Sequence, residues 1–479
     1  MDFAEQLRIL EAAAGNPALL YLASVDLAHP TLTEQERARI KEALIAAAVP
    51  HWCDTAFLAA LLDTTGEESE RLIGWLRSVK IVEPFAARGE AAFNIHETAR
   101  LALREYLRTT DPALWLTLAT RARAHLAASA EPHARIESLY HLFAIDQDAA
   151  AAECAALDWQ VTLLGRPEIS HALALPLVEL TTAGWPTGTA QVEALLAPLE
   201  VRNSRGEAAQ LEDEARRVLA LALATPSLSV TARAHCLLGD VLQTKGKLDD
   251  ALAAFREYSR ILHTLAEQDA TNSGLQRDLA VLHNRMGCIY EAQGKLDDAL
   301  AAFREGLRIL HTLAEQDATN AAWQHGLAVS HRHVGTIYEA QGKLDDALPA
   351  FCETLRITKK FAEQDATNAG WQREHAVAHN RVGCIYQKQG KLDDALAALR
   401  EDLRISQKLV EQDATNAGWR FDLALTQKSV GVVLQRMGEE GKAQSSFRWA
   451  VKTMERAVAM SPGNVGWQRD LANFKKWLR

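Results

Sequence analysis

The chain has 479 residues, which is enough for about three domains and a large buried core. Hydrophobic residues make up 48% of it and charged residues 24%, proportions typical of a globular protein. The net charge of −10 argues against a general nucleic-acid binder, because phosphate contacts need clustered Lys and Arg.

Neither a secretory leader nor a membrane span is expected. The opening MDFAEQLRIL carries acids in its first turns and lacks a basic lead before an apolar run. No apolar run approaches the roughly 18 to 20 residues that a membrane helix needs. The six cysteines are scattered without a CxxC pair, which indicates reduced thiols rather than a disulfide framework. Together these features predict a cytoplasmic protein.

Residues 1–110 are expected to form a small module of helices and one β-hairpin, after a short helical lead. Helical patterns run through TLTEQERARIKEALIAAAV, DTAFLAALLD and EESERLIGWLRSV. Two short strands follow, KIVEPFA and AAFNIH, joined by the turn ARGE around Gly89, and a further helix reads ETARLALREYLRTT. Three helices followed by a hairpin predict a winged-helix module.

This segment resembles the winged-helix and helical region that follows the nucleotide-binding module of STAND ATPases, the signalling NTPases of prokaryotic and eukaryotic immunity. The string GNPALL, from Gly15 to Leu20, is similar to the Gly-x-Pro helix start at the end of their ATPase module. The chain departs from these proteins because it contains neither GxxxxGKS nor GxxxxGKT. Without this phosphate-binding loop, ATP hydrolysis is not expected. The resemblance implies the sensor half of such a protein, detached from its motor.

A winged helix would also suit a DNA-binding regulator. Its recognition helix would be EESERLIGWLRSVK, which opens with Glu67, Glu68 and Glu70. These carboxylates would lie where DNA phosphates approach, so the charge favours a structural or protein-contact role.

Residues 111–227 are expected to be helical and to form degenerate repeats. The stretches WLTLATRARAHLAAS, SLYHLFAIDQDAAAAECAAL and HALALPLVELTTAG are helix candidates, whereas TTAGWPTGT and VRNSRGE are rich in loop-forming residues. The SRGE string around Gly206 marks the expected boundary before a regular array.

Two strings recur in residues 228–479 at an interval of 48 residues. They are EQDATN, beginning at Glu267, Glu315, Glu363 and Glu411, and GKLDDAL, beginning at Gly246, Gly294, Gly342 and Gly390. Each unit is predicted to contain two amphipathic helices. The glycine of GKLDDAL ends the first helix, its Asp pair suits the first turn of the second, and DATN supplies a turn and an N-cap. A single hairpin cannot bury its apolar faces, so the copies must stack into a solenoid.

The repeats resemble the tetratricopeptide repeat in their small and aromatic positions. These positions are Gly287, Tyr290, Ala299 and Phe303; Gly335, Tyr338, Ala347 and Phe351; Gly383, Tyr386, Ala395 and Leu399; with Gly239, Ala251 and Phe255 before them and Gly431, Ala443 and Phe447 after them. The family's usual unit has about 34 residues, and here about 14 more lengthen the helices, as in kinesin light chains. The resemblance implies an all-α, right-handed superhelix of five elongated repeats with a C-terminal capping helix.

The additional segment of each unit carries a column of large apolar residues, which we expect to clamp adjacent hairpins together. Its members are Trp323, Trp371, Trp419 and Trp467, with Leu275 in the first copy.

Histidines form a second column, expected to pack the first helix of each hairpin against the second. Its members are His235, His283, His331 and His379. His375 and His379 share a helix face, but no third ligand is evident, so no metal site is expected. The string HETAR at His96 is not HExxH, and GxSxG does not occur. We therefore expect neither a cofactor nor enzyme activity.

Positions that vary between copies lie on the first helix of each hairpin, which lines the concave face in tetratricopeptide arrays. Three columns there combine amide, charged and apolar residues, which would suit a peptide or helical segment of a partner. The predicted partner-binding residues are Arg233, Asn284, Glu291, Arg332, Glu339, Asn380, Gln387, Lys428 and Gln435. The family's carboxylate clamp for chaperone tails is not reproduced.

The resulting hypothesis is a non-enzymatic scaffold that acts as a sensor, adaptor or inhibitor subunit in a prokaryotic signalling or antiviral defence system. By the STAND resemblance, its partner would be a separately encoded effector, such as a caspase-like protease, a CRISPR-linked component or a transcription regulator. Two alternatives remain: a winged-helix DNA-binding transcription regulator with a repeat sensor domain, and a detached sensor subunit that works with a STAND-type ATPase.

Overall fold

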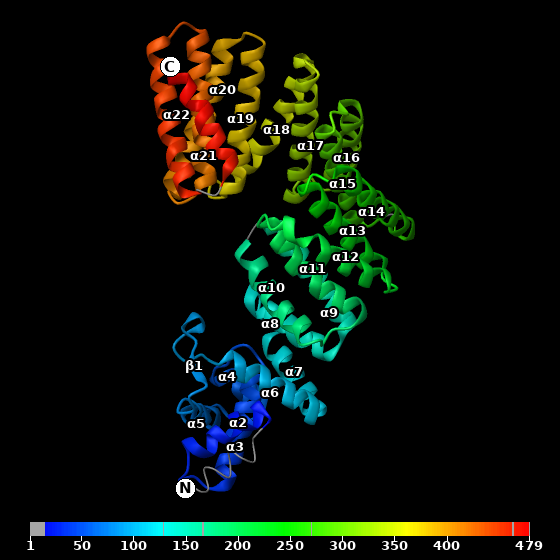
Figure 1. The fold of residues 1–479 in the computed structure, drawn as a ribbon, viewed down its shortest axis with the longest axis vertical. Coiled ribbons are helices and arrows are strands. Elements are labelled where there is room, and N and C mark those ends of the chain that lie inside the picture. The colour runs from blue at the N-terminus through cyan, green and yellow to red at the C-terminus, as the bar shows by residue number, and fades with distance from the viewer. Residues whose placement is uncertain (1–14, 128, 165–166, 270, 462–463, 479) are drawn as a thin grey trace. The chain divides into compact units, whose positions relative to one another are not determined.

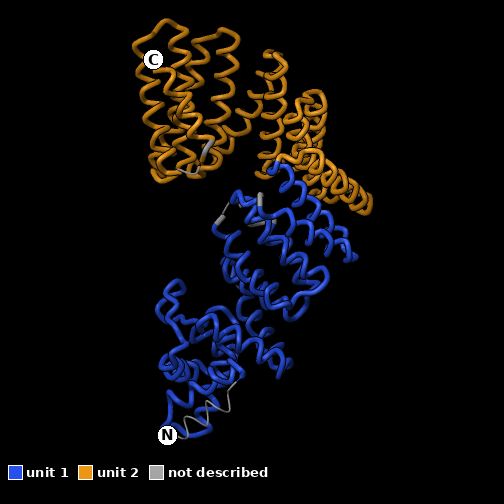
Figure 2. Tube along the Cα trace, in the orientation of Figure 1, with its two compact units in different colours: residues 1–245 blue, residues 246–479 orange. Residues whose placement is uncertain are grey.

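The computed structural model describes residues 15–127, 129–164, 167–269, 271–461 and 464–478. Two expectations concern the segment MDFAEQLRIL, namely that no secretory leader is present and that a short helical lead precedes the first module. This segment lies outside the described residues. The chain divides into two compact units, residues 1–245 and 246–479 (Figure 2). Its described part is almost entirely α-helical and contains a single two-stranded sheet (Figure 1).

The first unit begins with short helices and a hairpin. These are α2 (Pro17–Ala28), α3 (Glu34–Ala48), α4 (Thr55–Leu62), α5 (Gly66–Leu76), β1 (Val82–Pro84), the 3-10 turn η1 (Ala86–Arg88) and β2 (Phe93–Ile95). The side chains of Thr33, Asp54 and Thr65 cap α3, α4 and α5 by accepting backbone N–H groups. The strands pair antiparallel, and Gly89 in the turn has a φ of 106°, which favours glycine. The helices and strands expected between residues 31 and 96 are confirmed, although each strand has only three residues.

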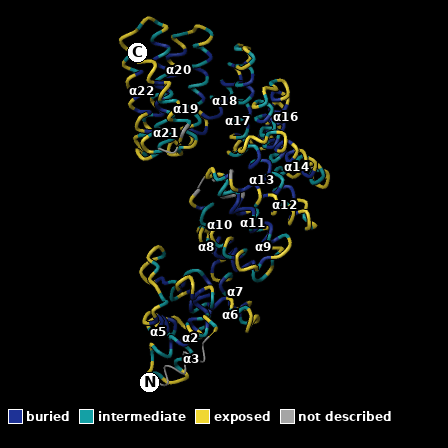
Figure 3. Tube along the Cα trace, viewed as in Figure 1, coloured by how far each residue is buried: buried dark blue, intermediate teal, exposed yellow. Residues whose placement is uncertain are grey.

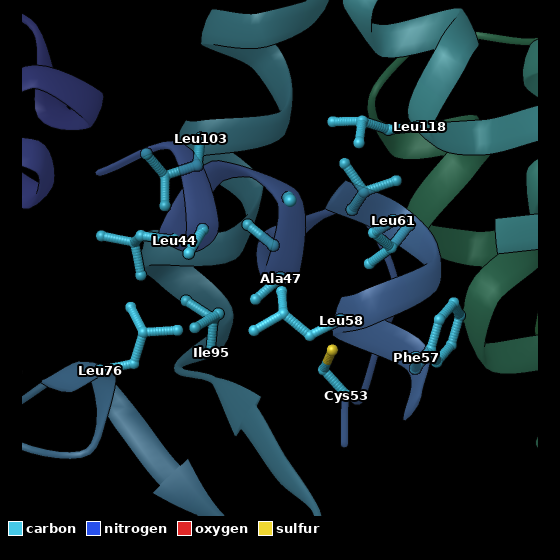
Figure 4. Close-up of a cluster of buried hydrophobic side chains, with 14 of the residues drawn as sticks. Leu44, Ala47, Cys53, Phe57, Leu58, Leu61, Leu76, Ile95, Leu103 and Leu118 are labelled. Atoms are coloured by element: carbon cyan, nitrogen blue, oxygen red, sulfur yellow. The ribbon is translucent and has the colours of Figure 1, made fainter. Parts of the chain in front are cut away.

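These elements share one apolar core with the next two helices (Figure 4). Those helices are α6 (Glu97–Thr110) and α7 (Pro112–Leu126). Leu44 of α3, Leu58 of α4, Leu103 of α6 and Leu118 of α7 are all buried in this core, together with Ile95 of β2. Each fully buried leucine contributes about 2 kcal/mol to folding, so the hairpin is fixed to the helices by packing.

The rest of the first unit is a series of helices with a second apolar core. They are α8 (Pro132–Ile145), α9 (Gln147–Leu164), α10 (Pro167–Thr182), α11 (Gly188–Ser204), α12 (Ala208–Leu223) and α13 (Leu228–Thr244). Two predictions are wrong in detail here. Residues 138–157, predicted as one helix, divide at Asp146, whose carboxylate accepts the N–H of Ala149 at 3.0 Å and caps α9. The stretch VRNSRGE, predicted as a loop, continues α11 as far as Ser204.

A buried network of polar side chains joins α6, α8 and α10. Arg104, which is 1% exposed, donates to two backbone carbonyls at the end of α3 and pairs with Glu179. The hydroxyl of Tyr140 donates to the same carboxylate at 2.7 Å. Burial alone would raise the pKa of Glu179, but His51 and Arg104 outweigh it and hold that pKa well below its usual range. Glu179 is therefore ionised and central to the packing of this unit.

The second unit is a stack of helical hairpins in which helices of 20 and 21 residues alternate. The first helices are α15 (Ser273–Ala292), α17 (Ala321–Ala340), α19 (Ala369–Lys388), α21 (Ala417–Arg436) and the shorter α23 (Val465–Phe474), which continues into the 3-10 turn η2 (Lys475–Leu478). The second helices are α14 (Leu248–Gln268), α16 (Leu296–Gln316), α18 (Leu344–Gln364), α20 (Leu392–Gln412) and α22 (Glu440–Met460). Buried and exposed residues alternate along these helices with the helical period (Figure 3).

The recurring strings produce this regularity through local chemistry. Asn320, the last residue of one DATN string, caps α17 by accepting the N–H of Trp323 at 3.2 Å. Gly294 has a φ of 73°, the left-handed conformation that ends α15, and Asp297 and Asp298 follow in the first turn of α16. The predicted all-α stack of hairpins is confirmed.

In the hairpins α15–α16, α17–α18 and α21–α22, a glycine of the first helix lets a phenylalanine ring of the second helix lie against the backbone, and in α19–α20 Leu399 takes the place of the ring. A Cβ atom on Gly335 would lie 2.9 Å from the ring of Phe351, and one on Gly287 would lie 2.6 Å from Phe303. Any larger residue would therefore push the two helices apart. This close approach explains why the small and aromatic positions recur together.

The tryptophan column joins successive hairpins, as predicted. Trp371 of α19 stacks on Phe361 of α18, with ring centroids 4.6 Å apart, and meets the ring of His325 of α17 edge-on at 5.6 Å. Trp467 of α23 stacks on Phe421 of α21 at 4.9 Å. The packing role is therefore confirmed for Trp371 and Trp467.

A ladder of side-chain hydrogen bonds also connects the copies in register. In each case a glutamine at the end of a first helix donates to an aspartate in the first turn of the preceding second helix. The pairs are Gln293 with Asp249 at 3.0 Å, Gln341 with Asp297 at 3.0 Å and Gln389 with Asp345 at 2.9 Å. Met437 occupies the next equivalent position and cannot continue the ladder.

Candidate protein-binding groove

The helices α15, α17, α19 and α21 are bonded to one another in chain order, so they form one layer of the array, which we call the first-helix layer. The bonds that join neighbours include Asn284 to Ser330 at 2.8 Å, Lys388 to Glu339 at 2.6 Å and Arg373 to Asp422 at 2.7 Å. Eight of the nine predicted partner-binding residues lie on this layer.

Three of the predicted residues bond to other side chains of the array. Asn284 exchanges hydrogen bonds with Ser330, and Glu339 pairs with Lys388. The amide of Asn380 donates to the carboxylate of Asp402 at 2.8 Å. These bonds connect helices of the array. The same three side chains also present polar atoms on the first-helix layer.

Two predicted residues carry charges that no carboxylate compensates among the described residues. Arg332 on α17 is half-buried and makes no ion pair with any residue that the structure describes. The ammonium of Lys428 on α21 lies 5.4 Å from the ring centroid of Phe474 and has no acidic partner in the described part of the chain. Glu291, Gln387 and Gln435 are half-buried on the same layer. Arg332 and Lys428 are thus the predicted residues best placed to attract an acidic or carbonyl-rich segment.

Arg233 has a different environment from the one the repeat pattern predicts. It lies on α13 in the first unit, where its guanidinium pairs with Asp158 at 2.7 Å, with Glu200 at 3.2 Å and with Glu193. Its charge is therefore already compensated within that unit. The sequence does not reveal this use, because the three carboxylates belong to other helices.

A pocket of about 350 Å³ opens between α19, α20 and α21. Asn380 is the predicted residue that lines it. Polar and charged residues on all three helices line the pocket, and Val377, Leu409, Trp419 and Leu425 form its apolar part. The remaining lining residues are Arg373, Ala376, Arg381, Asp402, Ser406, Asp422, Thr426 and Ser429.

Asp402 is the residue of this pocket that sequence reasoning missed. It lies on a second helix, α20, and is 3% exposed. Its carboxylate accepts hydrogen bonds from Asn380 at 2.8 Å, Ser406 at 2.9 Å and Thr426 at 2.6 Å. Burial raises the pKa of Asp402 to about 6, although these three donors oppose the shift.

A signal for Asp402 was present in the sequence. The residues 48 positions apart in the other copies are Tyr258, Gly306, Thr354 and Ala450, none of which carries a charge. The equivalent positions in the other copies carry uncharged residues. A single carboxylate at such an interior position therefore indicates a special use of the copy that contains Asp402.

The helices of the array differ in net charge. The first helices α19 and α21 each carry three basic residues and one acidic residue. The second helices α16 and α20 are acidic, with four acidic and two basic residues in α16 and five and three in α20, whereas α22 has two acidic and four basic residues. The first-helix layer at α19 and α21 is thus positively charged in a chain whose net charge is −10.

Several histidines of the first helices lie partly buried between helices. Burial lowers the pKa values of His283, His331 and His379. Burial, with the neighbouring His379, lowers the pKa of His375 to about 4, and these two rings lie 4.7 Å apart. Among the described residues, no group of three or more His, Cys, Asp or Glu side chains is arranged to hold a metal ion. In the same part of the chain, no helix combines the length and the apolar character needed to cross a membrane.

Models of the tetratricopeptide repeat match residues 232–261, 280–309 and 376–413. The chain carries a tetratricopeptide-repeat array. Such arrays present extended surfaces for other proteins, so this architecture supports a protein-interaction scaffold. No curated protein matches the chain in sequence.

Several solved structures resemble this chain in fold. A Signal Transduction ATPase with Numerous Domains (STAND) protein from Pyrococcus horikoshii, PH0952, which has a tetratricopeptide repeat sensor, matches with a TM-score of 0.52 and 11% identity, over 96% of this chain and 70% of that one. BtubC (BKLC) from P. vanneervenii matches with a TM-score of 0.40 and 20% identity, over 55% of this chain and 92% of that one. The apo form of RapI matches with a TM-score of 0.48 and 12% identity, over 65% and 77%. At these identities the likeness concerns the fold alone.

Proposed function

We propose that the chain is a non-enzymatic scaffold whose first-helix layer binds a peptide or helical segment of a partner protein. The observation that carries this proposal is where the copies differ. Gly287 and Gly335, which pack the two helices of a hairpin together, are the same from copy to copy, whereas the equivalent positions Asn284, Arg332, Asn380 and Lys428 hold three different residue types. Variation on one layer of an otherwise uniform stack suits an asymmetric ligand.

Within this function we place the chain as a sensor, adaptor or inhibitor subunit that acts in the cytoplasm on a separately encoded effector of a prokaryotic signalling or antiviral defence system. The support is the resemblance of the N-terminal segment to STAND proteins and the fold likeness to the Pyrococcus horikoshii protein. The phosphate-binding motif that such a protein needs for ATP hydrolysis does not occur in the chain.

We further propose three functional regions: a winged-helix region in 1–110, a degenerate helical region in 111–227 and the repeats in 228–479. The first match to the repeat model begins at residue 232, within the proposed first repeat. The compact units divide at a later point, between residues 245 and 246.

The charge of α5 supports a protein-contact role for the winged-helix region. Glu67 and Glu68 lie in its first turn, and Glu68 pairs with Arg39 at 2.9 Å. An acidic helix start would repel DNA phosphates, so we do not propose a DNA-binding function.

The test is capture of the partner from the native host, followed by mass spectrometry, with the wild type and the double variant Arg332→Glu, Lys428→Glu. We expect the double variant to lose the partner and to keep its helicity and melting temperature, because both side chains are partly solvent-accessible and have no acidic partner among the residues described. The matched control is Lys408→Glu, Lys452→Glu, which reverses two exposed charges on the second helices. Retained binding by a well-folded double variant would move the interface away from the first-helix layer.

A further inference from the structure

We propose that the pocket between α19, α20 and α21 receives a lysine or arginine side chain of the bound partner segment, with the carboxylate of Asp402 as its counter-ion. The inference rests on the proposed function, because it assigns the chemistry of one partner residue within the same first-helix layer.

The carboxylate of Asp402 is buried without a counter-charge. Its three hydrogen-bond donors, Asn380, Ser406 and Thr426, are all neutral. Among the described residues no basic side chain forms an ion pair with it, although it is only 3% exposed. A carboxylate in this environment is stabilised most by a cation that enters from outside.

The fold itself does not require a charge at this position. The preceding copy has Thr354, whose hydroxyl donates to the carbonyl of Ala328 at 3.1 Å, and the copy before that has Gly306. These uncharged residues accommodate the same helix packing. An aspartate in their place lowers stability through desolvation, so its presence in one copy indicates a use in binding.

The pocket has the size and the wall chemistry for a long basic side chain. Its volume of about 350 Å³ exceeds that of a single lysine or arginine side chain. Val377, Trp419 and Leu425 supply apolar surface for the methylene stem, while the charged end reaches the carboxylate.

The other charged residues that line the pocket indicate which groups lie next to the basic residue in the partner segment. Arg373 pairs with Asp422 at 2.7 Å, so this pair is internally compensated. Arg381 also lines the pocket and has no acidic partner among the described residues. It is therefore available to donate to a backbone carbonyl or an acidic side chain next to the basic residue. The expected ligand is a segment in which a basic residue is flanked by hydrogen-bond acceptors.

A purely structural role for Asp402 is the competing explanation, because its hydrogen bonds connect α19, α20 and α21. The two explanations differ in whether the purified chain discriminates a cation from a neutral group of the same shape. Citrulline has nearly the shape of arginine and lacks its charge, so it separates them.

The experiment measures binding of N-acetyl-arginine methylamide and N-acetyl-citrulline methylamide to the full chain by saturation-transfer NMR titration. We expect the arginine probe to bind about tenfold more tightly than the citrulline probe. Asp402→Asn, which keeps the side-chain shape, should reduce arginine binding to the citrulline level. Asp402→Thr, which copies position 354, should do the same if the asparagine variant folds poorly. The matched control is Asp394→Asn, an exposed carboxylate on the same helix, and should change nothing.

Equal binding of the two probes, no detectable binding of the arginine probe, or unchanged binding by folded Asp402 variants would overturn the proposal. The result is independent of the partner-capture experiment. If reversal of Arg332 and Lys428 abolishes capture while the probes fail to discriminate, only the role of Asp402 is wrong. If the probes discriminate while capture survives the reversal, the proposed partner interface is wrong.

Discussion

Replacement of Asp402 by asparagine is expected to stabilise the unliganded array at neutral pH. Burial raises the pKa of Asp402 from an ordinary value of 3.8 to about 6, so the folded chain holds this proton more tightly than the unfolded chain. The corresponding stability is fully present below a pH of about 3.8 and is lost as the pH rises through about 6. At neutral pH the ionised carboxylate therefore lowers the free energy of unfolding.

The magnitude follows from the difference between the two pKa values. About two pKa units correspond to about 3 kcal/mol at neutral pH. Asparagine removes this penalty and can keep the hydrogen bonds: its oxygen accepts from Asn380 and Thr426, and its amide donates to the hydroxyl of Ser406. Because these bonds to a neutral acceptor are weaker, we expect a net gain of about 1 to 3 kcal/mol.

Hydrogen exchange of α19, α20 and α21, measured by mass spectrometry at a pH of about 7.5 and of about 4.5, would report this local stability, since repeat arrays need not unfold in one step. The advantage of Asp402→Asn should shrink by about 2 kcal/mol at the lower pH. Other titratable or charged groups near the pocket are the same in both proteins, so their effects cancel: Arg373, His375, His379, Arg381 and Asp422. A variant that is less stable than the wild type at neutral pH, or a difference that does not depend on pH, would refute the reasoning.

Trp371→Ala should lower the free energy of unfolding by about 3 kcal/mol, because it removes a stacked ring between hairpins, and an unchanged urea midpoint would contradict this. Gly335→Ala should cost about 1 to 3 kcal/mol, because the new Cβ atom meets the ring of Phe351, whereas Gly441→Ala, with open space around it, should cost nothing comparable in the same measurement. Glu179→Gln should destabilise the first unit by about 3 kcal/mol at neutral pH. Since the pKa of Glu179 is lowered, the wild-type advantage is present above a pH of 4.5 and should decline in acid denaturation as the pH falls below it. The purified chain should not hydrolyse ATP, and steady phosphate release that survives removal of contaminating ATPases would show otherwise.

The repeat architecture is predictable from the sequence because its causes are local. Asn320 caps the helix that begins at the next residue, and Gly294 ends a helix within the same hairpin. Trp371 meets Phe361, only ten positions earlier in the chain. Helical periodicity and a constant interval of 48 residues therefore suffice to place the helices and their packing contacts.

Contacts between distant residues are not predictable in the same way. Arg104 pairs with Glu179, 75 residues away, and no periodic pattern relates the two. Arg233 matches the repeat register, but its environment is set by carboxylates of the preceding helices. Asp402 could have been found by comparison of the copies. Its burial and its three hydrogen-bond donors depend on how α19, α20 and α21 pack together. Comparison of the aligned copies in the sequence does not give this packing.

The near-identity of the hairpins affects how the array reaches its native order during folding. The Gln–Asp ladder uses the same donor and acceptor at successive steps, so the hairpin of α17 and α18 offers its neighbour almost the same surface as the hairpin of α19 and α20. A hairpin can therefore dock on the wrong copy, or on a copy in a second chain, with contacts close to the native ones. The short DATN turns oppose this, because they allow each hairpin to reach only the adjacent one. Residues that mark a single copy, such as Asp402, also oppose it, since a misplaced hairpin would leave that buried carboxylate without Thr426.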